Sequence, residues 1–143
     1  MEKKVLLFGF GDFAGIALAA GLKKQLRQKG ILAEMIDKKR YLIPLGLLTS
    51  QAGNERYSWD ALDGIPGMPS MQIYEGESLP NRILLFAGLD SGELDEALAV
   101  CRECGIKKDD LKAVLTPHNA TWNVLALSKE LHEEHEALNG GTK

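Results

Sequence analysis

The chain has 143 residues, 45% of them hydrophobic and 26% charged, which is the composition of a globular domain and excludes a disordered or fibrous protein. Its formal net charge of -3 provides no basic surface to collect nucleic-acid phosphates. No apolar stretch approaches the roughly 20 residues that span a bilayer, and two cysteines are too few for a secreted scaffold, so we expect a cytoplasmic protein without membrane or nucleic-acid partners.

The first half, residues 1–48, predicts the order strand, helix, strand, helix. Its strands are short apolar runs typical of a sheet buried on both faces. Its long helix carries apolar residues at helical spacing and ends at Gly30. The predicted elements are a strand at 5–8, a helix at 13–29, a strand at 31–37 and a short helix at 41–48.

The same order returns in the second half, residues 82–138. Asp90, followed three residues later by Glu93, predicts a capping box at the start of a helix that Gly105 ends. Thr121 is the predicted N-cap of the last helix. The predicted elements are a strand at 82–86, a helix from Asp90 to Gly105, a strand at 112–116 and a helix at 121–138.

The two halves also align in sequence. Residues 4–8 match residues 82–86, and residues 35–37 match residues 114–116 at an offset one residue larger. This similarity predicts an internal duplication.

We therefore predict a single α/β domain over residues 1–143, with a small, mainly parallel sheet of about four strands joined by helical crossovers. An α+β ferredoxin-like arrangement is the alternative. The connection at 49–81 is rich in glycine and proline, and it contains one further predicted strand at 71–74.

The second half resembles a known family. The strand and turn over residues 111–119, followed by Trp122 and the leucines of the last helix, are similar to the bacterial family catalogued as domain of unknown function 3783, over about residues 82–136. The resemblance implies no activity, cofactor or catalytic residue. The first half departs from the pattern, because residues 37–40 read Asp-Lys-Lys-Arg where residues 116–119 read Thr-Pro-His-Asn.

A glycine-rich turn follows the first strand and is the first candidate ligand site. Gly9, Gly11 and Ala14 fit the G-x-G-x-x-G/A pattern, in which the backbone approaches a pyrophosphate at a helix N-terminus. Asp37, at the end of the second strand, lies where dinucleotide-binding folds place an acid on the ribose. Asp12, in the same turn, is a further candidate ligand-binding residue, although its charge would lie beside the phosphates of a dinucleotide and so opposes that ligand. The alternative is that the glycines only permit a tight turn and close packing.

His118 and Asn119 form the second candidate site, between a strand and a helix N-terminus. Ligands bind at the carboxyl ends of the strands in an open parallel sheet. We therefore expect this turn to hold an anion or a partner's carboxylate, and to share one rim of the sheet with Gly9. The alternative is that Asn119 or Thr121 caps the last helix while His118 faces solvent.

The remaining chemistry-bearing residues predict no metal site and no catalytic residue. Cys101 and Cys104 form a Cys-x-x-Cys, but they lie at the end of a helix, which disfavours a thiolate, and Cys101 continues the apolar face. His132 and His135 are three residues apart rather than the four of a zinc-protease helix. No nucleophile stands recognisably beside His118.

These observations favour a non-catalytic regulatory or binding module for an unidentified small ligand or protein, with no cofactor assigned. A nucleotide- or dinucleotide-binding protein that uses residues 9–14 is the alternative. Residues 13–20 are apolar on nearly every side of their helix, which predicts that a second chain covers them, as in a homodimer.

Overall fold

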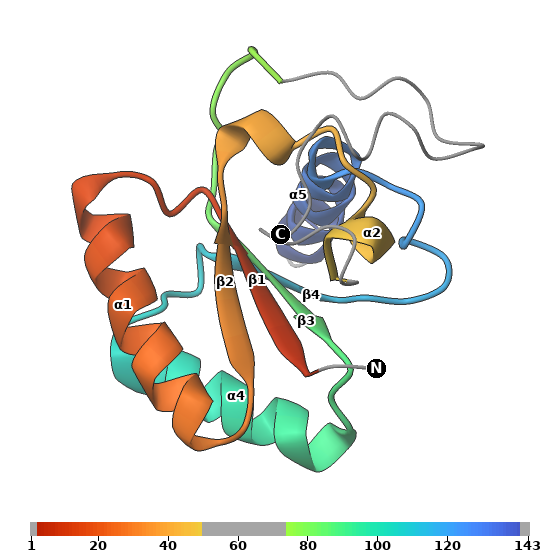
Figure 1. Cartoon of the computed structure of the whole chain (residues 1–143). Helices are drawn as coiled ribbons and strands as arrows, with labels where there is room; N and C mark the ends of the chain where they lie inside the picture. Colours follow the sequence, from red (N-terminus) through yellow and green to blue (C-terminus); the bar gives the residue numbers. More distant parts are fainter. Residues whose placement is uncertain (1–2, 50–73, 141–143) are drawn as a thin grey trace.

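The computed structural model describes residues 3–49 and 74–140, in which one four-stranded sheet carries helices on both faces (Figure 1). Its strand order is β2-β1-β3-β4. The elements are β1 (Lys4–Phe8), α1 (Phe13–Gln28), β2 (Leu32–Ile36), the 3-10 helix η1 (Lys38–Arg40), α2 (Leu45–Thr49), β3 (Ile83–Ala87), α4 (Ser91–Cys104), β4 (Leu111–Val114) and α5 (Val124–Gly140).

The pairing of the strands confirms a mainly parallel α/β fold. β1 pairs with β2 in parallel and β3 pairs with β4 in parallel, whereas the two inner strands, β1 and β3, are antiparallel. Helices cover both faces, so the ferredoxin-like alternative, with its helices on one face, is wrong. The predicted strand at 71–74 lies outside the described residues except for Tyr74.

The two halves follow an approximate two-fold axis through the centre of the β1–β3 pair, where Leu6 lies opposite Leu85. Lys4 pairs with Leu32 as Ile83 pairs with Leu111, so equivalent strand residues are separated by an offset of 79, whereas the helix N-caps Asp12 and Asp90 are separated by 78. Residues 4–8 therefore correspond to residues 83–87, and the alignment with 82–86 is wrong by one position. An uninterrupted apolar run contains no alternation that would fix such a register.

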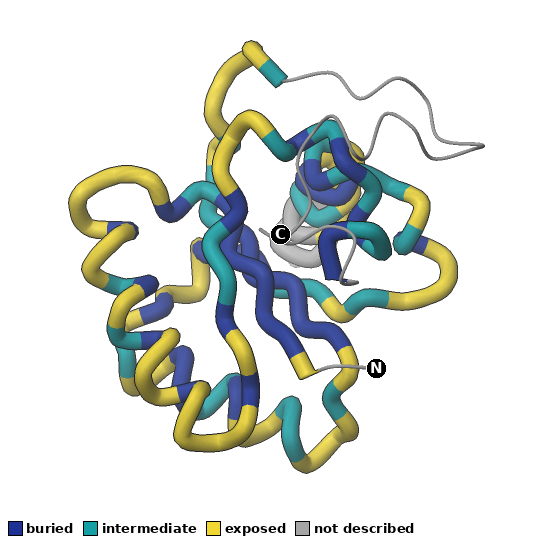
Figure 2. Tube along the Cα trace, in the orientation of Figure 1, coloured by how far each residue is buried: buried dark blue, intermediate teal, exposed yellow. Residues whose placement is uncertain are grey.

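Both faces of the inner strands are buried, which explains their continuous apolar sequence (Figure 2). Val5 and Leu7 pack in one core with α1 and α4. Leu6 and Phe8 pack in the other core with α2 and α5. The two cores hold the sheet between two helical layers.

The helix ends follow local capping chemistry. The predicted capping box of Asp90 and Glu93 is present, and Gly105 ends α4 with a φ of 103°. The last helix begins later than predicted, because the side-chain oxygen of Asn123, not Thr121, accepts a hydrogen bond from the Ala126 amide at 3.0 Å. No helix in the described ranges is long and apolar enough to cross a membrane.

The predicted helix at 41–48 is also divided differently. η1 ends before Tyr41, and α2 begins only after Pro44, at Leu45. Pro44 cannot donate a backbone hydrogen bond, so it is suited to precede a helix rather than to continue one.

The antiparallel pairing of β1 and β3 overturns the expectation that all four turns share one rim. Phe8, at the end of β1, lies opposite Ile83, at the start of β3. The turns after β1 and β2 therefore lie at one end of the strands, and the turns after β3 and β4 lie at the other end. Gly9 and His118 are consequently at opposite ends of the sheet.

Candidate functional site

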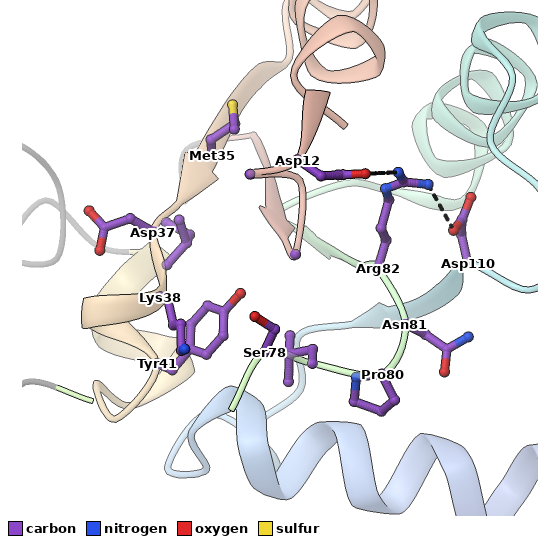
Figure 3. A pocket seen from close by; sticks show the side chains of 14 residues that line it. Asp12, Met35, Asp37, Lys38, Tyr41, Ser78, Pro80, Asn81, Arg82 and Asp110 are labelled. Carbon is purple, nitrogen blue, oxygen red and sulfur yellow. Dashed lines mark hydrogen bonds and ion pairs between the residues drawn. The ribbon is translucent and has the colours of Figure 1, made fainter. Parts of the chain in front are cut away.

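A cleft of about 760 Å³ opens at the end of the sheet where β1 and β2 end and β3 and β4 begin (Figure 3). Four of the predicted site residues line it: Gly9, Gly11, Asp12 and Asp37. They come together because β1 and β2 are parallel neighbours, so the turns that follow them are adjacent.

Asp12 is held by two sets of donors. Its side chain caps α1 by accepting a hydrogen bond from the Gly15 amide at 3.2 Å. Arg82 Nη2 donates to both carboxylate oxygens, at 3.1 and 3.3 Å. These hydrogen bonds from Arg82 lower the pKa of Asp12 below its ordinary 3.8, so the carboxylate stays charged.

Arg82 also lies near a second carboxylate, that of Asp110, so the guanidinium stands between two acidic side chains (Figure 3). Its Nη1 is 3.9 Å from Asp110 Oδ1, while Asp110 Oδ2 accepts a hydrogen bond from the Lys107 amide at 2.9 Å. The guanidinium also stacks over the Phe10 ring at 5.7 Å. Two carboxylates therefore share one guanidinium, and the cluster Asp12–Arg82–Asp110 carries a net charge of −1.

Sequence reasoning missed Arg82 and Asp110. Arg82 was assigned to a strand, and its main partner is 70 residues away in the chain. The likeness of the two halves offers a signal for Arg82. Lys3 occupies the equivalent position in the first half, and it pairs with Glu93 in the first turn of α4. At each end of the inner strands, a basic residue that precedes one strand thus pairs with an acidic residue at the start of the other half's helix: Lys3 with Glu93, and Arg82 with Asp12. This repetition indicates that Asp12 joins the halves, in addition to any contact with a ligand.

The opposite wall of the cleft is aromatic and polar. Tyr41 is buried, which raises the pKa of its hydroxyl above 10, and a hydrogen bond with the Gly9 backbone partly opposes this shift. Its ring lies against Phe8 and Tyr74, with centroids 6.1 and 5.8 Å apart. Asp37 has a side chain that is 64% exposed, with Arg40 Nε 3.6 Å from its Oδ2.

Ala14, the last residue of the glycine-rich pattern, lines a different groove of about 520 Å³ beside α1 and the end of α4. Arg82 and Asp110 line both hollows and so separate them. The two glycines and Ala14 therefore do not surround one space.

The second candidate site has a structural explanation. Asn119 is only 8% exposed, and its side chain accepts from the Thr116 amide at 2.9 Å and donates to the Val114 carbonyl at 3.0 Å. His118 is exposed and meets the Trp122 ring edge-on, with centroids 5.2 Å apart. Asn119 thus closes the turn after β4, rather than capping the last helix.

The first half has an equivalent arrangement with different residues. Arg40, at the position equivalent to Asn119, donates from Nη2 to the Met35 carbonyl at 3.1 Å, as Asn119 donates to Val114. Both carbonyls lie near the end of an edge strand, where a side-chain donor also protects the edge from pairing with another chain. The segments 37–40 and 116–119 therefore share a structural role despite their different sequences.

Burial disfavours the thiolate form of both cysteines. Cys101 lies in the core, where burial raises the pKa of its thiol to about 11, and burial also raises the pKa of Cys104. Within the described residues no group of three metal-ligating side chains is found. His132 and His135 both lie on α5.

Comparison with known proteins extends only to the second half of the chain. Residues 82–138 match the family described as Domain of unknown function (DUF3783), in agreement with the resemblance of the turn and last helix. The matched segment contains β3, α4, β4 and α5, and so includes Arg82 and Asp110 but not the turn at Gly9. No similar curated protein and no similar solved structure was found.

Proposed function

We propose that this chain is a binding module whose ligand site is the cleft at the carboxyl ends of β1 and β2. The observation that carries the proposal is the convergence of Gly9, Gly11, Asp12 and Asp37, from two strand ends, on one cleft of about 760 Å³. That volume lies within the range of small-molecule sites, about 300–1,000 Å³.

The charges of the cleft favour a ligand with hydrogen-bond donors or a positive group. Three carboxylates, from Asp12, Asp37 and Asp110, face two cations, Lys38 and Arg82. Arg82 is already bonded to Asp12 and lies near Asp110, so its charge is matched within the protein. Asp37, being well exposed, is the carboxylate best able to accept a new donor.

Thermal stabilisation by small polar compounds tests the proposal. Arginine, spermidine and ribose are suitable phosphate-free probes, because a ligand that binds only the folded chain raises its melting temperature as concentration increases. We expect at least one of them to stabilise the wild type. Asp37→Asn should weaken that binding about tenfold, since hydrogen bonds to a charged acceptor are the stronger kind.

Asp95→Asn is the matched control, because Asp95 is an exposed carboxylate on α4 and does not line the cleft. It should leave the stabilisation unchanged. Equal weakening by both variants would indicate a general charge effect and would contradict binding in the cleft. Absence of stabilisation by any probe at millimolar concentration would contradict the proposed ligand class.

A nucleotide is the second candidate, favoured by the parallel β1-α1-β2 unit in which Gly9, Gly11 and Asp37 line the same cleft. Its weakness is the occupied N-terminus of α1, where Asp12 already caps the first turn. A phosphate there would meet the Asp12 carboxylate unless the pair with Arg82 opened.

Gly11→Ala distinguishes this candidate. A Cβ at Gly11 meets no atom within 4 Å, so the fold tolerates it, whereas a phosphate approaching the turn would not. If NAD, NADP, FMN or ATP stabilises the wild type but not Gly11→Ala, the nucleotide assignment replaces ours. No stabilisation by any of the four removes it.

A further inference from the structure

The solvent face of the first half of α1 is apolar. Phe13 is 94% exposed and Ile16 is 53% exposed, and the exposed Ala17 and Ala20 continue the same stripe at helical spacing. Exposed Phe and Ile side chains this close together on one helix are characteristic of an interaction surface.

The equivalent helix of the second half shows that the fold does not require this stripe. Aligning the N-caps Asp12 and Asp90 places Ser91 at the position of Phe13 and Asp95 at the position of Ala17. Ser91 and Asp95 are exposed and polar, whereas Leu94 and Leu98, at the positions of Ile16 and Ala20, are half-buried and pack on the core. The exposed positions of α4 are therefore polar, and the exposed apolar side chains of α1 need a separate explanation.

The charges around the stripe favour a second copy of this chain as its partner. Beyond Ala20 the exposed face of α1 becomes basic, with Lys23, Lys24 and Arg27. Before Phe13 lies the cluster Asp12–Arg82–Asp110, which has one carboxylate more than it has cations. The stripe is thus flanked by a negative end and a positive end, and an antiparallel second copy is complementary to it at both ends.

We propose that a second copy of this chain packs against α1 around a two-fold axis between Ile16 and Ala17. In this arrangement Phe13 lies over the partner's Ala20, and Lys24 lies beside the partner's Asp12 turn. A parallel pair would instead place the three cations of each copy together and align the two helix dipoles. This inference does not depend on the proposed ligand site.

Sedimentation of the full chain over a wide concentration range tests the dimer. Wild type should show a monomer–dimer equilibrium. Ala17→Asp, which reproduces the residue of α4, should raise the dissociation constant at least about tenfold, because two carboxylates would face each other at the axis. Gln25→Asp adds the same charge to an exposed position of α1 beside the stripe and should leave the dimer intact.

Circular dichroism and the melting temperature of both variants establish that they fold. Wild type that sediments as a monomer at every concentration overturns the proposal. A dimer that Ala17→Asp does not weaken overturns it as well, since the interface would then lie elsewhere.

Cysteine cross-linking tests the antiparallel direction. At 1.5 Å of rise per residue, two copies of residue 17 lie about 1.5 Å apart along the helix axis, whereas two copies of residue 13 lie about 10 Å apart. A disulfide requires Cα atoms within about 7 Å. Ala17→Cys should therefore cross-link under oxidation and Phe13→Cys should not, with wild type, which has only Cys101 and Cys104, as the blank. Cross-linking of Phe13→Cys would indicate a parallel pair and contradict the antiparallel arrangement.

Discussion

Arg82 shows how one residue can connect two distant parts of the chain. It bonds to Asp12 at the start of α1 and lies near Asp110 before β4. The carboxylate of Asp12 has a lowered pKa because Arg82 donates to it. A group with a lowered pKa contributes stability above its unfolded-state pKa, near 3.8, and loses that contribution as the pH falls through its folded-state pKa.

We therefore expect Arg82→Met to lower the urea midpoint at neutral pH. The difference from wild type should shrink as the pH falls below about 4, because Asp12 becomes protonated in both proteins. Urea unfolding at a series of pH values measures this. Lys3→Met, which removes the equivalent pair with Glu93, should show a similar but smaller pH dependence, because the Asp90 amide and the Lys3 ammonium both lower the pKa of Glu93 and only the second is removed. A pH-independent difference would show that Arg82 acts through packing on Phe10 instead.

Asn119 and His118 are neighbours, but their substitution should affect the stability of the protein to very different extents. Asn119→Ala should lower the free energy of unfolding by about 1–3 kcal/mol, because the Thr116 amide and the Val114 carbonyl lose their partner. His118→Ala should stay within about 0.5 kcal/mol, since the ring is exposed. Urea denaturation of both variants decides between them. Equal effects would contradict the structural role of Asn119.

The elements themselves were largely predictable, because helix ends are encoded locally. Asp90 and Glu93 form their capping box within one turn, and Gly105 ends the helix by adopting a positive φ that other residues avoid. The start of α5 was misplaced because two polar residues, Thr121 and Asn123, are both chemically able to cap it. The sequence limits the N-cap to these two residues, but only the path of the backbone determines which side chain reaches the free amides of the first turn.

The start of α1 distinguishes a glycine needed for packing from one that is not. A Cβ at Gly15 would lie 2.6 Å from the Phe10 carbonyl oxygen and would also meet the capping carboxylate of Asp12, whereas a Cβ at Gly11 meets nothing within 4 Å. Gly15→Ala should therefore destabilise the protein by about 1–3 kcal/mol, and Gly11→Ala should change stability by less than about 0.5 kcal/mol. Thermal and urea unfolding provide the comparison. Tolerance of Gly15→Ala would mean that the turn can move away from Phe10.

At the scale of the whole molecule, the direction of β3 relative to β1 could not be predicted. Both strands are buried on both faces, so neither has an alternating pattern that distinguishes its neighbours. Their relative direction depends on contacts between residues about 80 positions apart, such as Leu6 with Leu85. The antiparallel direction places Gly9 and His118 at opposite ends of the sheet, and so it decides which of the candidate residues can share a site.

The same antiparallel pair predicts that the two halves unfold together. Leu7 and Leu84 lie opposite each other on β1 and β3, are fully buried, and belong to one core with α1 and α4. Leu7→Ala and Leu84→Ala should each lower the free energy of unfolding by about 2–5 kcal/mol.

Hydrogen exchange followed by mass spectrometry measures the coupling in each variant, through peptides from β1 and from β3. Because one core spans both halves, either substitution should reduce protection in both strands to the same extent. Loss of protection confined to the substituted half would show two independent folding units and would contradict the prediction of one domain.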